Sequence, residues 1–242
     1  MWAVSCVRKI NLAWYGPLVT LARELIRLLD LDHPPVAFAF HEHEPAEQLR
    51  TRPAPEPAGC CFWQQAEQRR LHTTAADHAH CSVGSYTHGL ISLAEAAAGE
   101  DTAALVGSGW VTEADLGRAP RVAAIPAAIT YEPLDEADDA DVVLVRITAS
   151  SLMALQGACP ELSVVTKPQC QIVPLAFEGG IAVSPGCAVS RARTGLPSGE
   201  LTCALPAREL ADIVARLGRS LAADAAVSAY ADADLRQNFT PA

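Results

Sequence analysis

The residues in this chain that offer the most chemistry are its cysteines. There are eight of them, at Cys6, Cys60, Cys61, Cys81, Cys159, Cys170, Cys187 and Cys203. The N-terminal segment, residues 1–12, lacks a long apolar core followed by a small-residue cleavage site, so we expect a cytoplasmic protein with reduced thiols. A reduced thiol can be a small buried hydrophobe, a nucleophile or a metal ligand.

Four cysteines stand where a functional thiol would be expected. Cys61 and Cys81 each come where a loop meets the predicted start of a helix, and free N–H groups there lower the pKa of a thiol. Cys170 lies at a segment boundary, and Cys187 follows a Ser-Pro-Gly turn that could direct it into a cavity. The alternative for each is simple packing, and the doubled Cys60-Cys61 leaves open which of the two is the ligand.

The spacing of these cysteines favours a site assembled by the fold. No pair among them has the Cys-x-x-Cys spacing of an ordinary zinc knuckle. Four separated thiols that converge would suit an iron–sulfur cluster, possibly 4Fe-4S, with a closed zinc site as the alternative. We expect Arg191 and His80 to lie beside this centre or to face a substrate.

The remaining cysteines and histidines have plainer interpretations. Cys6, Cys159 and Cys203 lie in or beside apolar segments and are expected to be structural. The tract His41–Glu44 is typical of a solvated strand end. For His88, a core position and a pocket position both remain open.

Two further functions compete with metal binding. One is a metal-free enzyme that uses Cys81 beside His80 against a small electrophile. The other is an accessory protein that binds a small molecule, with incidental cysteines. Glycine-rich phosphate loops, Gly-x-Ser-x-Gly turns and His-Glu-x-x-His helices are absent from the sequence, and it does not determine a reaction, a substrate or an oligomeric state.

The composition excludes several classes of protein. The chain has 242 residues, of which 50% are hydrophobic and 19% charged, so it can bury a sizeable core. A net charge of −10 opposes binding to nucleic acid, which needs clustered Lys and Arg. The apolar runs are shorter than the roughly 20 residues that cross a bilayer, so no membrane partner is expected.

Hydrophobic periodicity predicts mixed helices and strands. The expected helices are Pro17–Leu31, Cys60–Arg70, Ser85–Ala98, Ala149–Gly157 and Ala207–Leu221. The expected strands are Val36–Phe40, Pro120–Pro133, Asp141–Thr148, Leu162–Val165, Ile181–Val183 and Glu200–Leu205, while Gln171–Phe177 suits either state. This order indicates an α/β or α+β fold in a single domain, residues 1–222, with a mixed sheet flanked by helices. Residues 223–242 form an Ala/Asp-rich tail that continues as helix or frays.

A set of these residues also resembles a known family, the uncharacterised ArCR family (domain of unknown function 169). The resemblance rests on Cys61, Cys81, Gly84, Tyr86, Gly89 and Leu90, and later on Cys170, Cys187, Arg191 and the segment Glu200–Pro206. It extends over roughly Leu18 to Leu217, with a departure at Ala149–Met153, where the family often has a Pro-x-Gln stretch. The resemblance implies one domain with a cysteine-centred site.

Overall fold

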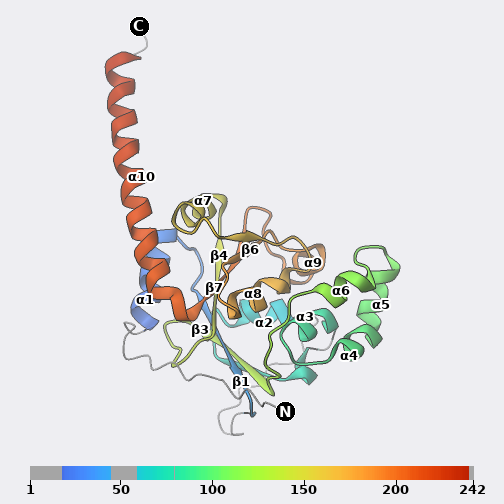
Figure 1. Ribbon diagram of the computed structural model, residues 1–242. Helices are drawn as coiled ribbons and strands as arrows, with labels where there is room; N and C mark the ends of the chain where they lie inside the picture. Colours follow the sequence, from blue (N-terminus) through green and yellow to red (C-terminus); the bar gives the residue numbers. More distant parts are fainter. Residues whose placement is uncertain (1–17, 45–58, 79, 240–242) are drawn as a thin grey trace, which may run out of the picture.

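A computed structural model of the protein describes residues 18–44, 59–78 and 80–239. The expectations for Cys6 and for the N-terminal segment fall outside these residues. Within the described part of the chain, one mixed sheet of seven strands has helices on both of its faces (Figure 1). This confirms the predicted single domain with a mixed sheet flanked by helices, and of the two classes left open, α/β and α+β, the fold is α/β.

The sheet has the strand order β2-β3-β1-β4-β7-β6-β5. Its strands are β1 (Val36–His41), β2 (Leu71–Thr73), β3 (Ala128–Pro133), β4 (Val142–Ile147), β5 (Ser163–Val164), β6 (Ala182–Ser184) and β7 (Leu201–Pro206). Strands β5 and β6 are parallel, and all other neighbours are antiparallel. The sheet is therefore mixed, as predicted.

Side chains that alternate in direction along the strands form two hydrophobic cores, one on each face of the sheet. In β4, Val143, Val145 and Ile147 face one core, and Val142 and Leu144 face the other, because successive side chains of a strand point to opposite faces. Helices α1 (Leu18–Leu29), α7 (Ala149–Ala158) and α10 (Leu210–Asn238) cover the first face. Helices α2 (Gly59–Gln65) and α8 (Ile172–Phe177) cover the second, so the sheet lies between two helical layers.

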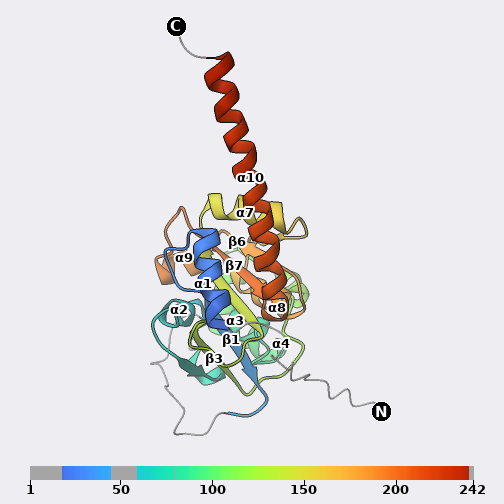
Figure 2. The same cartoon turned by 90° about the vertical axis from the view of Figure 1, so that its left-hand side faces the viewer.

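Helices α1 and α10 follow the predicted apolar spacing. Leu21 and Leu25 of α1 are buried, as are Ile213 and Leu217 of α10. Beyond Leu217, α10 has no buried residue, and its C-terminal half projects away from the body of the protein (Figures 1 and 2). The Ala/Asp-rich segment thus continues as helix as far as Asn238.

A smaller lobe of short helices follows α2. It contains α3 (Ser82–Thr87), α4 (Leu93–Ala98), α5 (Glu100–Gly107) and α6 (Glu113–Arg118). A third apolar cluster, built around Val83, Tyr86, Ala96 and Leu116, holds this lobe together. Three-residue 3-10 turns occur at Ala75–Asp77, Gln169–Gln171 and Ala207–Glu209, and α9 (Ala188–Thr194) follows β6.

The prediction of one helix over Ser85–Ala98 was wrong. The chain forms α3 and α4 instead, because Gly89 has a φ of +83° and cannot continue a right-handed helix. A side chain at this position would also meet the carbonyl oxygen of Ala124. Helix α4 then starts afresh at Ser92, whose hydroxyl accepts the N–H of Glu95 in a capping box.

Other predicted boundaries shift for local reasons. The strand expected over Pro120–Pro133 is confined to β3, since prolines at 120 and 126 cannot donate to a ladder. The helix expected over Cys60–Arg70 ends at Gln65, and the ambiguous run Gln171–Phe177 is helical. None of the helices among the described residues combines the length and the apolar character needed to cross a bilayer.

Candidate functional site

The cysteines named from the sequence meet at one cavity. This cavity, of about 170 Å³, lies between α2, the start of α3, the turn Gln169–Gln171 and α9. Four thiol-bearing residues line it: Cys60, Cys81, Cys170 and Cys187. Because one water molecule needs only about 10–15 Å³ of such space, the cavity can hold a ligand of several atoms.

The titration of the thiols reflects their proximity. Burial raises the pKa of the Cys170 thiol, and the neighbouring Cys81 and Cys187 raise it further. The pKa of Cys60 is raised first by its hydrogen bond with Cys61, then by burial and by Cys81. Segments far apart in the sequence therefore bring their sulfur atoms close enough to influence one another.

Cys61 does not line this cavity. Its Sγ points to the backbone of α9, where it donates to the carbonyl oxygen of Arg193 over 3.9 Å. Of the doubled pair, Cys60 is the residue on the cavity wall. The structure thus brings Cys81, Cys170 and Cys187 of the predicted set together and adds Cys60, whereas Cys61 lies next to the site.

Cys81 has the most polar surroundings of these thiols. Burial raises its pKa, while hydrogen bonds from the backbone of Gly59 and Gly84 and the Arg193 guanidinium act to lower it. The Asp101 carboxylate acts against the guanidinium and raises the pKa of Cys81. This carboxylate also accepts the backbone N–H of Ser82 at 2.8 Å. The groups that favour a thiolate are therefore present at Cys81, but burial outweighs them.

Cys187 lies at the start of α9, as its position after the turn suggests. Gly186 adopts a φ of +81°, and the Sγ of Cys187 then accepts the N–H of Ser190 at 3.4 Å. Arg191 has a different role from the one expected. Its guanidinium donates to the carbonyl oxygens of Pro185, Leu196, Pro197 and Glu200, and so holds the loop around α9 in place.

The arginine on the cavity wall is Arg193. Its Nη1 donates to the carbonyl oxygen of His80 at 2.6 Å, which joins α9 to the segment in front of Cys81. His80 itself lines the cavity. The open question about His88 is also answered, because His88 lines the cavity with its ring fully buried.

Aromatic rings fix the position of His88. Its ring lies edge-on to Phe38 and to His78, each with 6.4 Å between ring centroids, and 6.1 Å from Trp63. Burial lowers the pKa of His88 to about 3 and that of His78 to about 4. Both imidazoles are therefore uncharged at neutral pH.

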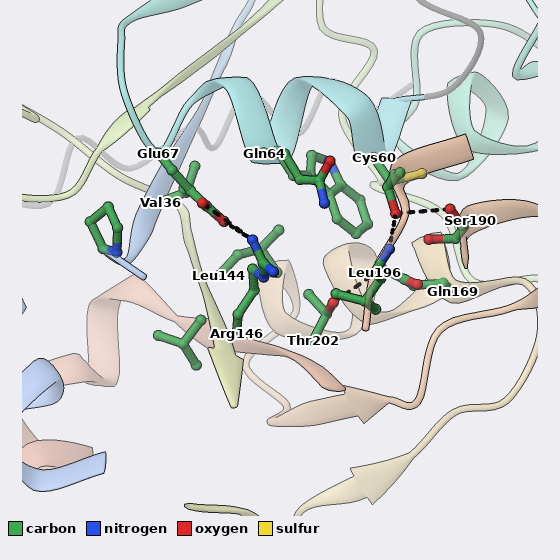
Figure 3. Close-up of a pocket in the computed structure, with 14 residues that line it drawn as sticks. Val36, Cys60, Gln64, Glu67, Leu144, Arg146, Gln169, Ser190, Leu196 and Thr202 are labelled. Atoms are coloured by element: carbon green, nitrogen blue, oxygen red, sulfur yellow. Dashed lines mark hydrogen bonds and ion pairs between the residues drawn. The ribbon is translucent and has the colours of Figure 1, made fainter. Parts of the chain in front are cut away.

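A second, smaller pocket adjoins the cavity. It encloses about 30 Å³ and shares Cys60, Trp63, Gln169 and Ser190 with the cysteine cavity (Figure 3). Its other end holds Arg146, whose guanidinium binds the carboxylates of Glu67 at 3.1 Å and Glu200 at 2.6 Å. The two carboxylates compensate the charge of the Arg146 guanidinium, and no sequence pattern pointed to these ion pairs.

The cysteines predicted to be structural lie elsewhere. Cys159 and Cys203 are fully buried in the core under α1, α7 and α10, on the face of the sheet opposite α2. In the described part of the chain, no group of three or more His, Cys, Asp or Glu side chains is placed to hold a metal ion. The cavity thiols surround a space and do not meet at one point.

Several residues of this site were missed in the sequence. Trp63, Gln169, Arg193 and Asp101 all line the cavity. Two of them had a usable signal, since Trp63 is two residues from Cys61 and Gln169 directly precedes Cys170. Asp101 belongs to α5, for which no element was predicted.

Fold and site together define an α/β protein with a cavity lined by four cysteines that form no disulfide. The sequence profile of the uncharacterised ArCR family, domain of unknown function 169, matches residues 24–216. The chain therefore belongs to this family, as its cysteine and glycine pattern suggested. Searches of curated proteins and of solved structures found no match.

Proposed function

We propose that this protein binds an iron–sulfur cluster in the cysteine cavity. The carrying observation is that Cys60, Cys81, Cys170 and Cys187, from four separate segments, line one cavity of about 170 Å³. Cysteine thiolates are the usual ligands of such clusters. Four reduced thiols also suit a cytoplasmic location, which forms part of the proposal.

A cluster fits the arrangement of the thiols better than a single zinc ion. Zinc needs four ligands, with sulfur at about 2.3 Å from one centre, so the thiols would have to move together. A cluster presents several iron atoms, and it can reach thiols that are spread around a cavity. With four thiolate ligands the site would serve electron transfer or structure, and with three an iron would stay open to a small substrate.

The raised pKa values of Cys81 and Cys170 are compatible with this role. A thiol that is protonated in the empty cavity is deprotonated when it binds a metal, and metal binding then releases the proton. Arg193, on the cavity wall, would offset part of the negative charge of the bound centre.

Anaerobic purification followed by cluster reconstitution tests the proposal. We expect a brown protein with visible absorption and with iron and acid-labile sulfide in stoichiometric amounts. Most of the iron should be lost in each of the variants Cys81→Ala, Cys170→Ala and Cys187→Ala. Comparing the iron content of Cys60→Ala with that of Cys61→Ala should show which member of the doubled pair is a ligand. Cys203→Ala is the matched control, because this thiol is buried in the opposite core. A colourless wild-type protein with substoichiometric iron would overturn the proposal.

A second candidate is a metal-free enzyme with Cys81 as its nucleophile. The favouring observation is that the backbone of Gly59 and Gly84 and the guanidinium of Arg193 all stabilise a thiolate at this sulfur. Alkylation by iodoacetamide as a function of pH separates the candidates. One fast-reacting thiol at position 81 in active, iron-free protein supports the enzyme, while several thiols that become reactive only after chelation support the cluster.

A further inference from the structure

The C-terminal half of α10 is a helix that packs against no other element of the described chain. After Leu217 the helix continues to Asn238, and none of these later residues is buried (Figures 1 and 2). Two of them are large and apolar, since the exposed fractions of Val227 and Tyr230 are 65% and 72%. Helices in proteins are stabilised mainly by the packing of one face, so this segment is a candidate interaction surface.

Six residues form one stripe along the projecting segment. They lie at positions i, i+4, i+7, i+8, i+11 and i+15, and side chains at these spacings share one face of an α-helix. The stripe consists of Arg219, Ala223, Ala226, Val227, Tyr230 and Asp234. At 3.6 residues per turn, it points away from the side on which Leu210 and Leu217 are buried. The stripe is therefore clear of the body of the protein.

The stripe matches itself when a second copy of the helix runs antiparallel to the first. Its spacing is the same from either end, so position 219 lies opposite 234, position 223 opposite 230, and position 226 opposite 227. Tyr230 then faces Ala223, and Val227 faces Ala226, so that each large side chain meets a small one. A two-fold symmetric contact requires such a self-complementary surface.

The charges at the two ends of the stripe specify this direction. Arg219 has no hydrogen bond or ion pair among the described residues. Asp234 accepts a hydrogen bond from Asn238 at 2.7 Å through only one of its two carboxylate oxygens. An antiparallel pair brings each Arg219 to the Asp234 of the other copy, whereas a parallel pair would bring like charges together. The net charge of −10 opposes self-association in general, so this local match of charges is needed.

We propose that two copies of this chain associate through an antiparallel pair of α10 helices, in contact along residues 219–234. Such a pair forms a small interface, and we expect it to assemble in the micromolar range. The contact lies outside the domain that carries the cysteine cavity, so the inference does not depend on the iron–sulfur proposal.

Sedimentation velocity of the full-length protein over the micromolar range tests the inference. The wild type should shift from monomer to dimer as its concentration increases. A chain that ends at Ala222 should stay monomeric, because it lacks most of the stripe. Below the dissociation constant of the dimer, the truncated and full-length chains should be about equally stable in urea.

Charge reversal tests the direction of the pair. Arg219→Asp and Asp234→Arg should each raise the dissociation constant at least tenfold, because each brings like charges together. The double variant with both changes should return to within threefold of the wild type. Asp232→Arg is the matched control, because it changes the net charge as Asp234→Arg does but lies on the opposite side of the helix, so it should not weaken the dimer.

Four outcomes would overturn the inference. They are a wild type that stays monomeric throughout the micromolar range, a dimer that persists in the truncated chain, a dimer that neither single reversal weakens, and a double variant that is not restored. All of these variants lie outside the cysteine cavity and should keep the iron content of the wild type after reconstitution. The dimer test therefore remains decisive whether or not a cluster is bound.

Discussion

The sulfur of Cys81 occupies the space that a side chain on Gly84 would need. A Cβ at position 84 would overlap this sulfur, and the backbone of Gly84 also forms a hydrogen bond to it. Glycine at this helical position therefore allows the first turn of α3 to close around the thiol. The close approach explains why a helix contains a residue that otherwise disfavours helices.

We expect Gly84→Ala to displace Cys81 from its place in the cavity. In an unconstrained helix, alanine in place of glycine stabilises by up to about 1 kcal/mol. At position 84 the overlap with the Cys81 sulfur should instead lower the free energy of unfolding, as measured by urea unfolding. It should also lower the iron content after reconstitution, as measured by metal analysis. Gly218→Ala is the control, because a Cβ at 218 in α10 meets nothing within 4 Å. Similar free energies of unfolding and similar iron contents in the two variants would contradict the prediction.

The buried histidines should make the protein less stable in mild acid. The folded-state pKa values of His78 and His88 are lowered to about 4 and about 3, whereas an unfolded histidine titrates near 6.5. Below pH 6.5 the unfolded chain binds more protons, so the free energy of unfolding falls with falling pH. Each histidine contributes about 1.4 kcal/mol per pH unit down to its folded-state pKa.

The variant His88→Gln isolates this effect. Its free energy of unfolding, from urea titrations at pH 7, 6 and 5, should fall less steeply than that of the wild type. The difference should be about 1.4 kcal/mol per pH unit below 6.5. Parallel pH profiles for the two proteins would show that His88 has the same pKa in the folded and unfolded states.

The ion pairs of Arg146 should matter more for stability than those on the surface. The Arg146 side chain is only 15% exposed and bonds to Glu67 and Glu200, so its removal leaves two poorly solvated carboxylates. We expect Arg146→Met to cost about 3 kcal/mol in urea unfolding. The control is Arg27→Met, because Arg27 and its partner Glu24 are 64% and 40% exposed and such pairs contribute about 0–1 kcal/mol. Comparable losses of unfolding free energy in the two variants would contradict the greater contribution of the Arg146 ion pairs.

The projecting half of α10 should be dispensable for folding. Leu217 is the last buried residue of this helix, so a chain that ends at Ala222 should keep its free energy of unfolding within about 0.5 kcal/mol. Leu217→Ala, by contrast, should cost about 2–5 kcal/mol. A loss above about 1 kcal/mol on truncation would mean that the domain extends beyond residue 222.

Local patterns in the sequence predicted the elements that build the two cores. The spacing of Leu18, Leu21 and Leu25 predicted α1, and the apolar run Asp141–Thr148 predicted β4, because one-sided burial imposes a period on the chain. The lobe of α3 to α6 was harder to predict. Its helices have six to eight residues, too few for periodicity to show, and the break at Gly89 depends on contact with residues 122–126.

The sequence by itself determined the family, a mixed sheet flanked by helices and the cysteines worth considering, because these depend on residue identity and spacing. Only the tertiary structure decided that Cys60 and not Cys61 lines the cavity, that Arg191 holds a loop, and that Trp63, Gln169 and His88 line the same cavity as the thiols. Side-chain direction and hydrogen-bond satisfaction depend on how remote segments pack against one another, and no local pattern in the sequence encodes that packing.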